Sequence, residues 1–477
     1  MYLNDRLNNS VYFHSINGVC KTRVVFKIWS KIAFIGAFLV LLISAYSLCK
    51  IKAVSAAYLY GYPLLMMEQS RLTSQSNLET PSFINRFNHI QEFPNHEFRN
   101  VVRPNNDTLY SNAWIDLSIE PLVLSVPDTE NRYYVMPFMD AWTNVFAMVG
   151  KRTTGTSKGT YLVVGPDWSG ALPDGMLKLA SPTNIVWLIG RIQTNGEDDI
   201  ANVVALQKKF SLTSLSKWRR GQRGEEIVSR KRNLTQSPMS IVESYSPSNY
   251  FSRLSSLMYE QASSSADGAA LENLKKLGIV PGKKFERLNM FDQLLFEKAF
   301  SLTQQRMVER LNSVPSDENG WSVHRSIIGD YGKNYAFRAG VAKVGLGALP
   351  PQEAVYPSTK VDALGQRLSG DGRYKIHFKK GDAPPVNAFW SLSIYNDEGF
   401  FIENKINRYA IGDRDALNYN ADGSLDILIQ VDEPKNAKGN NWLPAPSGYF
   451  SLTMRLYSPK QRFISGGWKL PKVERVR

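Results

Sequence analysis

Three short segments carry the side chains with the greatest potential for chemistry, and the first is RPNNDTLY at residues 103–110. It offers a cation, two amides, a carboxylate and a phenol: Arg103, Asn105, Asn106, Asp107 and Tyr110. These groups could wall a polar pocket in which the carboxylate acts as a general acid or base. The same residue types also form Asx turns that lead into strands. Both interpretations are open from the sequence.

The second segment is DAWTN at residues 140–144, which places an acid close to a tryptophan. Trp142 could form a stacking platform for a sugar beside Asn144. Asp140 would then be the acid or base, because apolar surroundings raise the pKa of a carboxyl group. The alternative is a tight hairpin with a tryptophan in the core.

The third segment is a predicted strand over residues 185–193 that carries Arg191 and Gln193 on its apolar face. A buried arginine needs a carboxylate or a ligand as its partner. Three carboxylates could serve: Asp107, Asp116 and Asp140. The sequence therefore leaves a structural ion pair and an anion-binding pocket as equal alternatives.

Several other kinds of site find no support in the sequence. Both cysteines, Cys20 and Cys49, lie in the N-terminal leader, so the rest of the chain has no disulfide, thiol nucleophile or thiolate–zinc site. The five histidines lack metal-ligand spacing, and no metal or cofactor is predicted, although carboxylate-bound calcium stays open. GTSKG at 155–159 matches a serine-hydrolase pattern, but a strand follows where that pattern needs a helix, which favours a glycine-rich hairpin.

The elements that must position these residues follow from the hydrophobic pattern. Residues 98–195 predict short strands between turn formers: 109–117, 133–138, 143–149, 160–164 and 185–193. Residues 197–345 carry helical periodicity, with Asp267 as one N-cap and a longer helix from Phe291 to about residue 312. Strands return after residue 346, where alternation predicts half-buried strands: 388–395, 425–432 and 449–457.

We therefore predict a mainly β fold with a helical insert. The predicted domains are an N-terminal membrane anchor or signal segment (1–57), a β-sandwich (58–200), a helical insert (201–345) and a jelly-roll-like sandwich (346–477).

The leader contains an uncharged stretch of 18 residues, Ile32–Cys49, flanked by basic residues. This length can span a bilayer, and the larger basic cluster before it predicts that end in the cytoplasm and the body outside it. The stretch could be a retained anchor, a signal peptide cleaved near Val54-Ser55-Ala56, or a segment lipidated at Cys49. A helix is predicted to follow over residues 53–75.

The net charge of +14 is concentrated in two places. Residues 1–52 carry +6 and residues 208–232 carry +7, which leaves about +1 for the rest. A nearly neutral body has no broad phosphate-binding surface, so no nucleic-acid partner is predicted. The basic stretch 217–232 could be a solvated loop or could meet anionic lipid.

Longer motifs resemble two families of unknown function. The domain-of-unknown-function 1254 family is similar in three stretches: RPNNDTLYSNAWIDLS (103–118), MDAWTNVFAMVGKRTTGT (139–156) and SPTNIVWLIGRIQTNG (181–196). Its companion, the 1214 family, is similar over residues 387–415 and 440–459. The resemblance implies an exported bacterial protein with an N-terminal immunoglobulin-like sandwich, a helical insert and a C-terminal jelly-roll-like domain. It adds weight to the three segments above, but it implies no catalytic mechanism.

The leading hypothesis is a cell-envelope hydrolase or related enzyme that acts on a polar small molecule or glycan in a pocket between the two β domains. In this hypothesis Asp107 or Asp140 is the acid or base, Arg191 binds an anionic group, and Tyr110 and Trp142 form walls. The alternatives are an envelope binding protein that uses the same pocket without chemistry, and a structural envelope protein without a small ligand. All three place the body in the cell envelope, either anchored to the membrane or exported.

Overall fold

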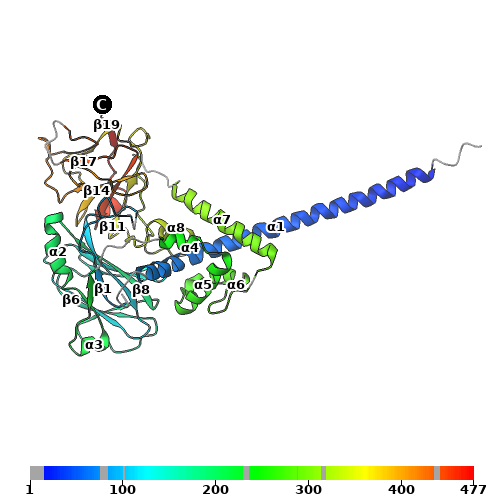
Figure 1. The fold of residues 1–477 in the computed structure, drawn as a ribbon, viewed down its shortest axis with the longest axis horizontal. Helices are drawn as coiled ribbons and strands as arrows, with labels where there is room; N and C mark the ends of the chain where they lie inside the picture. Colours follow the sequence, from blue (N-terminus) through cyan, green and yellow to red (C-terminus); the bar gives the residue numbers. More distant parts are fainter. Residues whose placement is uncertain are drawn as a thin grey trace, which may run out of the picture.

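The computed structural model describes residues 16–75, 84–99, 102–228, 236–286, 288–312, 319–434 and 441–476. Two β units lie one above the other on one side of the molecule, and a group of helices packs beside them (Figure 1). One long helix, α1, runs out of this group and projects far beyond the folded body. The fold is thus mixed α/β rather than mainly β.

The first β unit consists of two sheets that share one core. The larger sheet has the order β10-β1-β2-β8-β4-β5. Its strands are β1 (Phe87–His89), β2 (Thr108–Asp116), β4 (Tyr134–Asp140), β5 (Val145–Gly150), β8 (Ile185–Gln193) and β10 (Glu226–Val228). The smaller sheet has the order β7-β6-β3-β9. Its strands are β3 (Leu122–Val126), β6 (Gly159–Val164), β7 (Leu177–Ala180) and β9 (Ser211–Ser214). The core contains side chains from both sheets, among them Leu109, Leu124, Val163 and Leu188.

The predicted strands of this unit are confirmed, and their ends agree to within two residues. The strand predicted over residues 185–193 has the same first and last residues as β8. β9 and β10 lie in the region predicted to be helical, because strands of three or four residues carry too short a pattern to be seen locally. β9 is fixed by antiparallel pairing with β3, which is distant in sequence.

The second β unit also has two sheets around one core. One sheet has the order β11-β18-β14-β15, and β12 also pairs with β18. Its strands are β11 (Ala354–Val355), β12 (Ser358–Thr359), β14 (Trp390–Asn396), β15 (Ala410–Gly412) and β18 (Phe450–Tyr457). The other has the order β17-β16-β13-β19. Its strands are β13 (Arg373–Phe378), β16 (Leu425–Gln430), β17 (Trp442–Pro444) and β19 (Val473–Val476).

The alternation predicted for this unit is confirmed for one face, because Leu392, Ile427 and Leu452 lie together in the core. The prediction that the strands are half-buried is wrong for β18, which is buried along its whole length. Its second face lies against the first β unit, where Tyr457 packs with Tyr133. The polar face of β18 therefore belongs to an interface between the two β units.

The helices of the middle region pack around the C-terminal half of α1 (Ile16–Gln75). They are α4 (Pro238–Glu243), α5 (Pro247–Glu260), α6 (Gly268–Lys276), α7 (Met290–Asn312) and α8 (Tyr335–Val344). Aromatic rings form the centre of this core, where the centroid of the Tyr58 ring lies 4.7 Å from the ring centroids of both Tyr250 and Phe300. The smaller helices are α2 (Ile200–Gln207), α3 (Leu215–Arg219) and α9 (Gln461–Ile464).

One of two helix predictions is confirmed in full, and the other only in part. The long helix predicted from Phe291 is confirmed as α7. Asp267 directly precedes α6, but its side chain makes no capping hydrogen bond. It is buried instead, and it accepts hydrogen bonds from the hydroxyls of Tyr60 (3.2 Å) and Tyr335 (2.8 Å).

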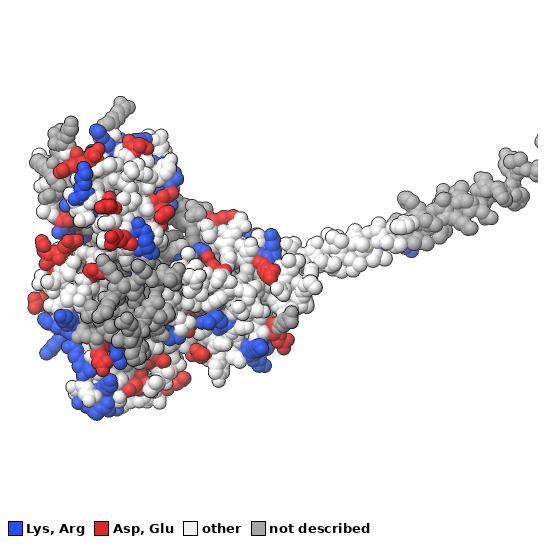
Figure 2. All heavy atoms as spheres, viewed as in Figure 1, with Lys and Arg blue, Asp and Glu red and all other residues white. Residues whose placement is uncertain are grey.

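α1 is one continuous helix of 60 residues, whereas the sequence predicts an apolar leader and a separate helix over residues 53–75. Pro63 lies inside α1 without ending it. The stretch Lys31–Ser74 is long and apolar enough to cross a membrane, and no part of its most apolar window, which has a mean hydropathy of 2.4, is buried in the body. Figure 2 shows this projecting part as a nearly uncharged rod.

The described part of the basic stretch, at α3, lies away from the projecting helix. α3 is at the lower end of the first β unit, and α1 leaves the body on the opposite side (Figure 1). Residues 229–232 of the stretch lie outside the described residues. Contact between α3 and a membrane that α1 crosses is therefore not supported.

Candidate functional site

The structure brings the first and third segments together and places the second elsewhere. On paired strands β2 and β8, Tyr110 lies opposite Arg191 and Thr108 lies opposite Gln193. Directly opposite residues project from the same face of a sheet. Asp140 lies at the far end of β4, about five residues, or roughly 16 Å, from the point where that strand passes Arg191.

Asp107 joins the first β unit to the second. Its carboxylate forms an ion pair with Arg414 and accepts a hydrogen bond from the Ser391 hydroxyl (2.7 Å). Arg414 also donates to the backbone oxygens of Asp107 (3.1 Å) and Thr194 (2.8 Å). Only 1% of Asp107 is exposed. The carboxylate is thus fully engaged in a contact between the two units.

Asn105 makes a second connection between the units. Its side-chain nitrogen donates to the hydroxyls of Thr108 (3.0 Å), Tyr110 (3.3 Å) and Tyr457 (2.9 Å). The last of these belongs to β18 of the second β unit. The amide therefore orients two tyrosines that come from different units.

The other predicted binding residues near this junction differ in the hydrogen bonds that they make. Arg103 reaches across to the Ser358 hydroxyl (2.8 Å). Asn106 is half-buried, and its side-chain oxygen has no hydrogen-bond partner among the described residues. Gln193 donates to the side chain of its neighbour Asn195 (2.8 Å) at the rim.

Arg191 is buried, with 6% of the residue exposed, and its described partners are uncharged. Its guanidinium donates to the backbone oxygens of Ile189 (3.2 Å) and Gly347 (2.7 Å), and it lies 5.3 Å from the centre of the Tyr110 ring. Within the described part of the chain, no carboxylate lies within 4.0 Å of it. The structural ion pair considered from the sequence is therefore absent there, since Asp107 is bound to Arg414.

Arg455, on β18 of the second β unit, is likewise a buried arginine with uncharged hydrogen-bond partners. It is 4% exposed and donates to the Ser393 and Tyr395 hydroxyls and to the backbone oxygens of Arg103 and Pro104 (both 3.1 Å). All of these acceptors are neutral. No ion pair of Arg455 is found among the described residues.

We refer to these groups as the arginine–tyrosine cluster, and it comprises Asn105, Asp107, Tyr110, Arg191, Tyr356, Arg414, Arg455 and Tyr457. It contains three guanidinium groups and one carboxylate. The neighbouring carboxyl of Asp413 interacts with Arg414 and Asp107, and burial raises its pKa to about 6. The cluster and this neighbour together therefore carry an excess of about one positive charge when Asp413 is ionised and about two when it is protonated. A neighbouring pair, Arg152 and Glu353 (2.6 Å), is neutral by itself. Tyr110 and Tyr356 are half-buried, which shows that solvent reaches the cluster.

The positive charge affects the acidity of Tyr110. Burial alone would raise the pKa of this phenol, but the charge of Arg191 and the hydrogen bonds from Asn105 and Arg191 outweigh burial, and the pKa lies below its usual value. Tyr356 shows the opposite balance, because burial raises its pKa to about 12 despite the same arginine. The site thus stabilises negative charge most strongly beside Tyr110.

The second segment is a tight turn between the first β unit and the helices. Asp140 accepts hydrogen bonds from the backbone nitrogens of Trp142 (2.9 Å) and Asn144 (2.8 Å) and from the Asn144 side chain (3.0 Å). Burial raises the pKa of Asp140 to about 6, although the bonds from Asn144 oppose this rise. Thr143 has a φ of 71°, a strained value for a β-branched residue.

Trp142 fixes this turn to the helical core. The ring is 3% exposed and lies 4.9 Å from Tyr60, and the indole nitrogen donates to the Ala262 carbonyl (2.9 Å). Trp142 therefore lies away from Arg191, and the turn has the geometry of a hairpin with a buried tryptophan.

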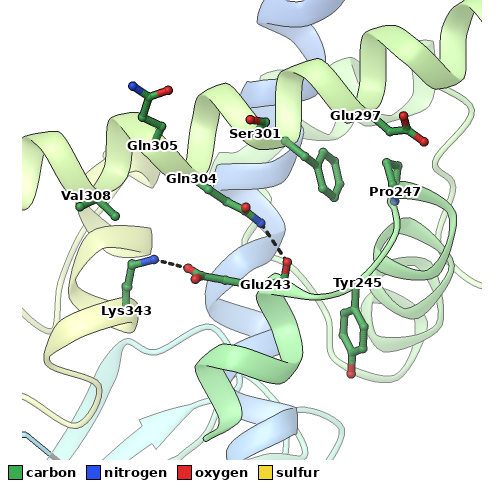
Figure 3. A pocket seen from close by; sticks show the side chains of 10 residues that line it. Glu243, Tyr245, Pro247, Glu297, Ser301, Gln304, Gln305, Val308 and Lys343 are labelled. Carbon is green, nitrogen blue, oxygen red and sulfur yellow. Dashed lines mark hydrogen bonds and ion pairs between the residues drawn. The ribbon is translucent and has the colours of Figure 1, made fainter.

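A separate groove of about 460 Å³ lies among the helices (Figure 3). Its walls come from α4, α5, α7 and α8, and they include Tyr245, Ser301 and Gln305. An ion pair between Glu243 and Lys343 crosses one end, so the two charges largely neutralise each other. A polar molecule could lie here, but none of the ten residues predicted from the sequence lines this groove. No sequence signal could have found it, because its lining comes from four helices that only the fold brings together.

Metal ligation has no structural support in the described part of the chain. There, no group of three or more histidine, cysteine, aspartate or glutamate side chains could hold a metal ion.

Comparisons with known proteins agree with the two-unit architecture. The family described as "Protein of unknown function (DUF1254)" matches residues 84–214, and the one described as "Protein of unknown function (DUF1214)" matches residues 353–461. No curated protein matches the chain.

Several solved structures are similar, and two of them illustrate the likeness. The first is the VPA0106 protein from Vibrio parahaemolyticus, with 25% identity and a TM-score of 0.68 over 90% of this chain and 100% of that chain. The second is a putative uncharacterised protein from Burkholderia cenocepacia, with 12% identity and a TM-score of 0.44 over 91% and 96% of the respective chains. The chain therefore belongs to the family of proteins that carry a DUF1254 domain followed by a DUF1214 domain.

Proposed function

We propose that this protein is a membrane-anchored cell-envelope protein that binds a small anionic molecule, such as an acidic sugar, at the arginine–tyrosine cluster. The observation that carries the proposal is the excess of buried guanidinium groups. Arg191 and Arg455 have no carboxylate partner in the described part of the chain, although both are almost fully buried.

The free-energy cost of burying an unpaired charge supports this proposal. A buried charge is expensive unless it is paired, and neutral hydrogen-bond acceptors satisfy the N–H groups without cancelling the charge. A carboxylate or phosphate group beside Arg191 would supply the missing negative charge and accept paired N–H donors. The lowered pKa of Tyr110 supports the same location, because the site already favours an anion there.

We propose binding in preference to hydrolysis because of how the two candidate carboxylates are engaged. Asp107 is held by Arg414 and Ser391, and Asp140 by the nitrogens of its own turn. If chemistry does occur at the cluster, Tyr110 is the better acid or base, since it lies beside Arg191 and its pKa is lowered.

The envelope location rests on α1. Its exposed apolar stretch fits a membrane span, and the basic residues before it favour a cytoplasmic N-terminus with the body outside. Retention of the anchor is favoured over cleavage near Val54-Ser55-Ala56, because Val54 and Ala57 are buried in the helical core. We further propose that the first β unit is an immunoglobulin-like sandwich and the second a jelly-roll-like one, in line with two sheets around each core.

The binding proposal is tested by thermal unfolding of the full-length protein in detergent, with phosphate, citrate and glucuronate compared with neutral glucose. A ligand at about 100 times its dissociation constant should raise the melting temperature by roughly 3 °C. Arg191→Met should abolish the shift, and Arg373→Met, at an exposed position on β13, should retain it. Equal shifts in both variants, or no shift with any anion, would contradict the proposal.

A further inference from the structure

α1 passes without a break from its exposed apolar stretch into the core of the body. Leu48 is 64% exposed, whereas Val54 and Tyr58 are fully buried. The distance from Leu48 to Val54 is six residues, or about 9 Å along a helix. The chain thus has no flexible linker between the proposed membrane span and the body, and the body must lie close to the bilayer surface.

The first turn of α7 packs against α1 at this junction. The Tyr46 hydroxyl donates to Asp292 (3.1 Å), and the Tyr46 ring stacks on Phe291, with centroids 6.2 Å apart. Lys50 forms an ion pair with Asp292 (3.4 Å). Both helices meet where α1 leaves the body (Figure 1). These contacts fix the start of α7 at the level of Tyr46.

That level coincides with the expected surface of the bilayer. Trp29 is 67% exposed and Tyr46 is 48% exposed; Trp29 lies just before the apolar stretch of α1, and Tyr46 lies near its C-terminal end. They are separated by about 26 Å along the helix, close to the thickness of the hydrocarbon core, ~30 Å. Tryptophan and tyrosine favour the two interfaces of a membrane. Tyr46 therefore marks the outer interface.

The start of α7 exposes large apolar side chains at this same level. Met290 is 87% exposed, Leu294 is 62% exposed and Phe291 is 46% exposed. Together they form an apolar surface continuous with the exposed face of α1. Exposed apolar surface of this kind has a cost in water and needs a partner.

We propose that Met290, Phe291 and Leu294 insert into the interfacial region of the bilayer and seat the body on the membrane in a fixed orientation. The inference rests on the anchor proposed above, because it takes the bilayer surface from the position of α1. The occupant is lipid, since the patch adjoins the lipid-facing part of α1. The membrane-spanning part of α1 and the start of α7 then form two contacts between the protein and the membrane. Because the body is held at two points, it cannot rotate freely about α1.

The test uses full-length protein without its two cysteines, with a single new cysteine that carries an environment-sensitive fluorophore, in phosphatidylcholine vesicles. Met290→Cys tests the inference, Val40→Cys tests the anchor, and Leu364→Cys, at a position that is 80% exposed in the second β unit, is the water-facing control. Lipids that carry a quencher near the headgroup should quench the label at 290, and lipids with a quencher deep in the chains should quench the label at 40. The control label should not be quenched.

The two proposals fail in different ways. A label at 40 that is not quenched would overturn the anchor and this inference together. Quenching at 40 with a water-like, unquenched label at 290 would overturn the inference and leave the anchor standing. A label at 290 that is shielded from water but not quenched by lipid would show that protein, such as a second copy of the chain, covers the patch, and would also overturn it.

Discussion

Substitution of Asp107 by asparagine should weaken the junction between the two β units severely. Asp107 is the carboxylate of the arginine–tyrosine cluster, with 1% of its side chain exposed against 15% for its partner Arg414. Asp107→Asn keeps the volume but leaves three guanidinium groups at the cluster without a carboxylate. Breaking a buried pair from one side costs about 3–5 kcal/mol, and we expect a loss in this range in the free energy of unfolding.

The assay is urea unfolding of the full-length protein in detergent, followed by tryptophan fluorescence. The matched control is Asp397→Asn, which removes an ion pair with Arg367 whose side chains are about half exposed, and which should cost less than about 1 kcal/mol. The double variant Asp107→Asn/Arg414→Met should recover much of the loss, because it removes the charge left without a partner. A cost for Asp107→Asn no larger than the control, or a double variant no more stable than Asp107→Asn, would refute the reasoning.

Three further predictions concern single residues. The pKa of Tyr110 should lie below the usual value of a phenol, and the difference between the ultraviolet absorbance titrations of the native protein and of Tyr110→Phe measures it. Anion binding should weaken as the pH rises through that pKa, because the phenolate repels the ligand. Asp140 has a pKa raised by burial to about 6 against roughly 3.9 unfolded, so it should favour folding below about pH 4 and lose about 2–3 kcal/mol of that contribution as pH rises through 6. Asp140→Asn should flatten this part of the pH dependence of thermal stability. Thr143→Gly should stabilise the protein by up to about 1 kcal/mol in the urea assay, because glycine adopts a φ of 71° without strain; a loss of stability would show that the threonine side chain matters more than its backbone.

Much of the fold was predictable because its strands are patterned locally. The strand over 185–193 carries apolar residues at alternate positions between clear turns, and β8 has these bounds. The continuity of α1 was harder to predict, because Lys50 and Lys52 interrupt the apolar run and Pro63 disfavours a helix interior. In the structure Lys50 finds a charged partner in Asp292, a contact that local sequence cannot show.

The candidate site was predictable only in part. Arg191 stood out because its charge falls on an apolar face, and its strand neighbour Tyr110 belonged to a motif already noted. Arg455 and Tyr457 were missed because alternation assigned them to the outward face of β18. That face carries serine, threonine and tyrosine rather than lysine or glutamate, which is the one signal that could have indicated a covered surface.

The most direct test of the central claim is calorimetric titration of the full-length protein with the anion that stabilises it most, alongside Arg191→Met. The account predicts saturable binding of about one anion per chain, weakened about tenfold or more in the variant, because the hydrogen bonds to a charged group are lost. Saturable binding with the same affinity in Arg191→Met would contradict the account, and so would a native protein that binds no anion at all.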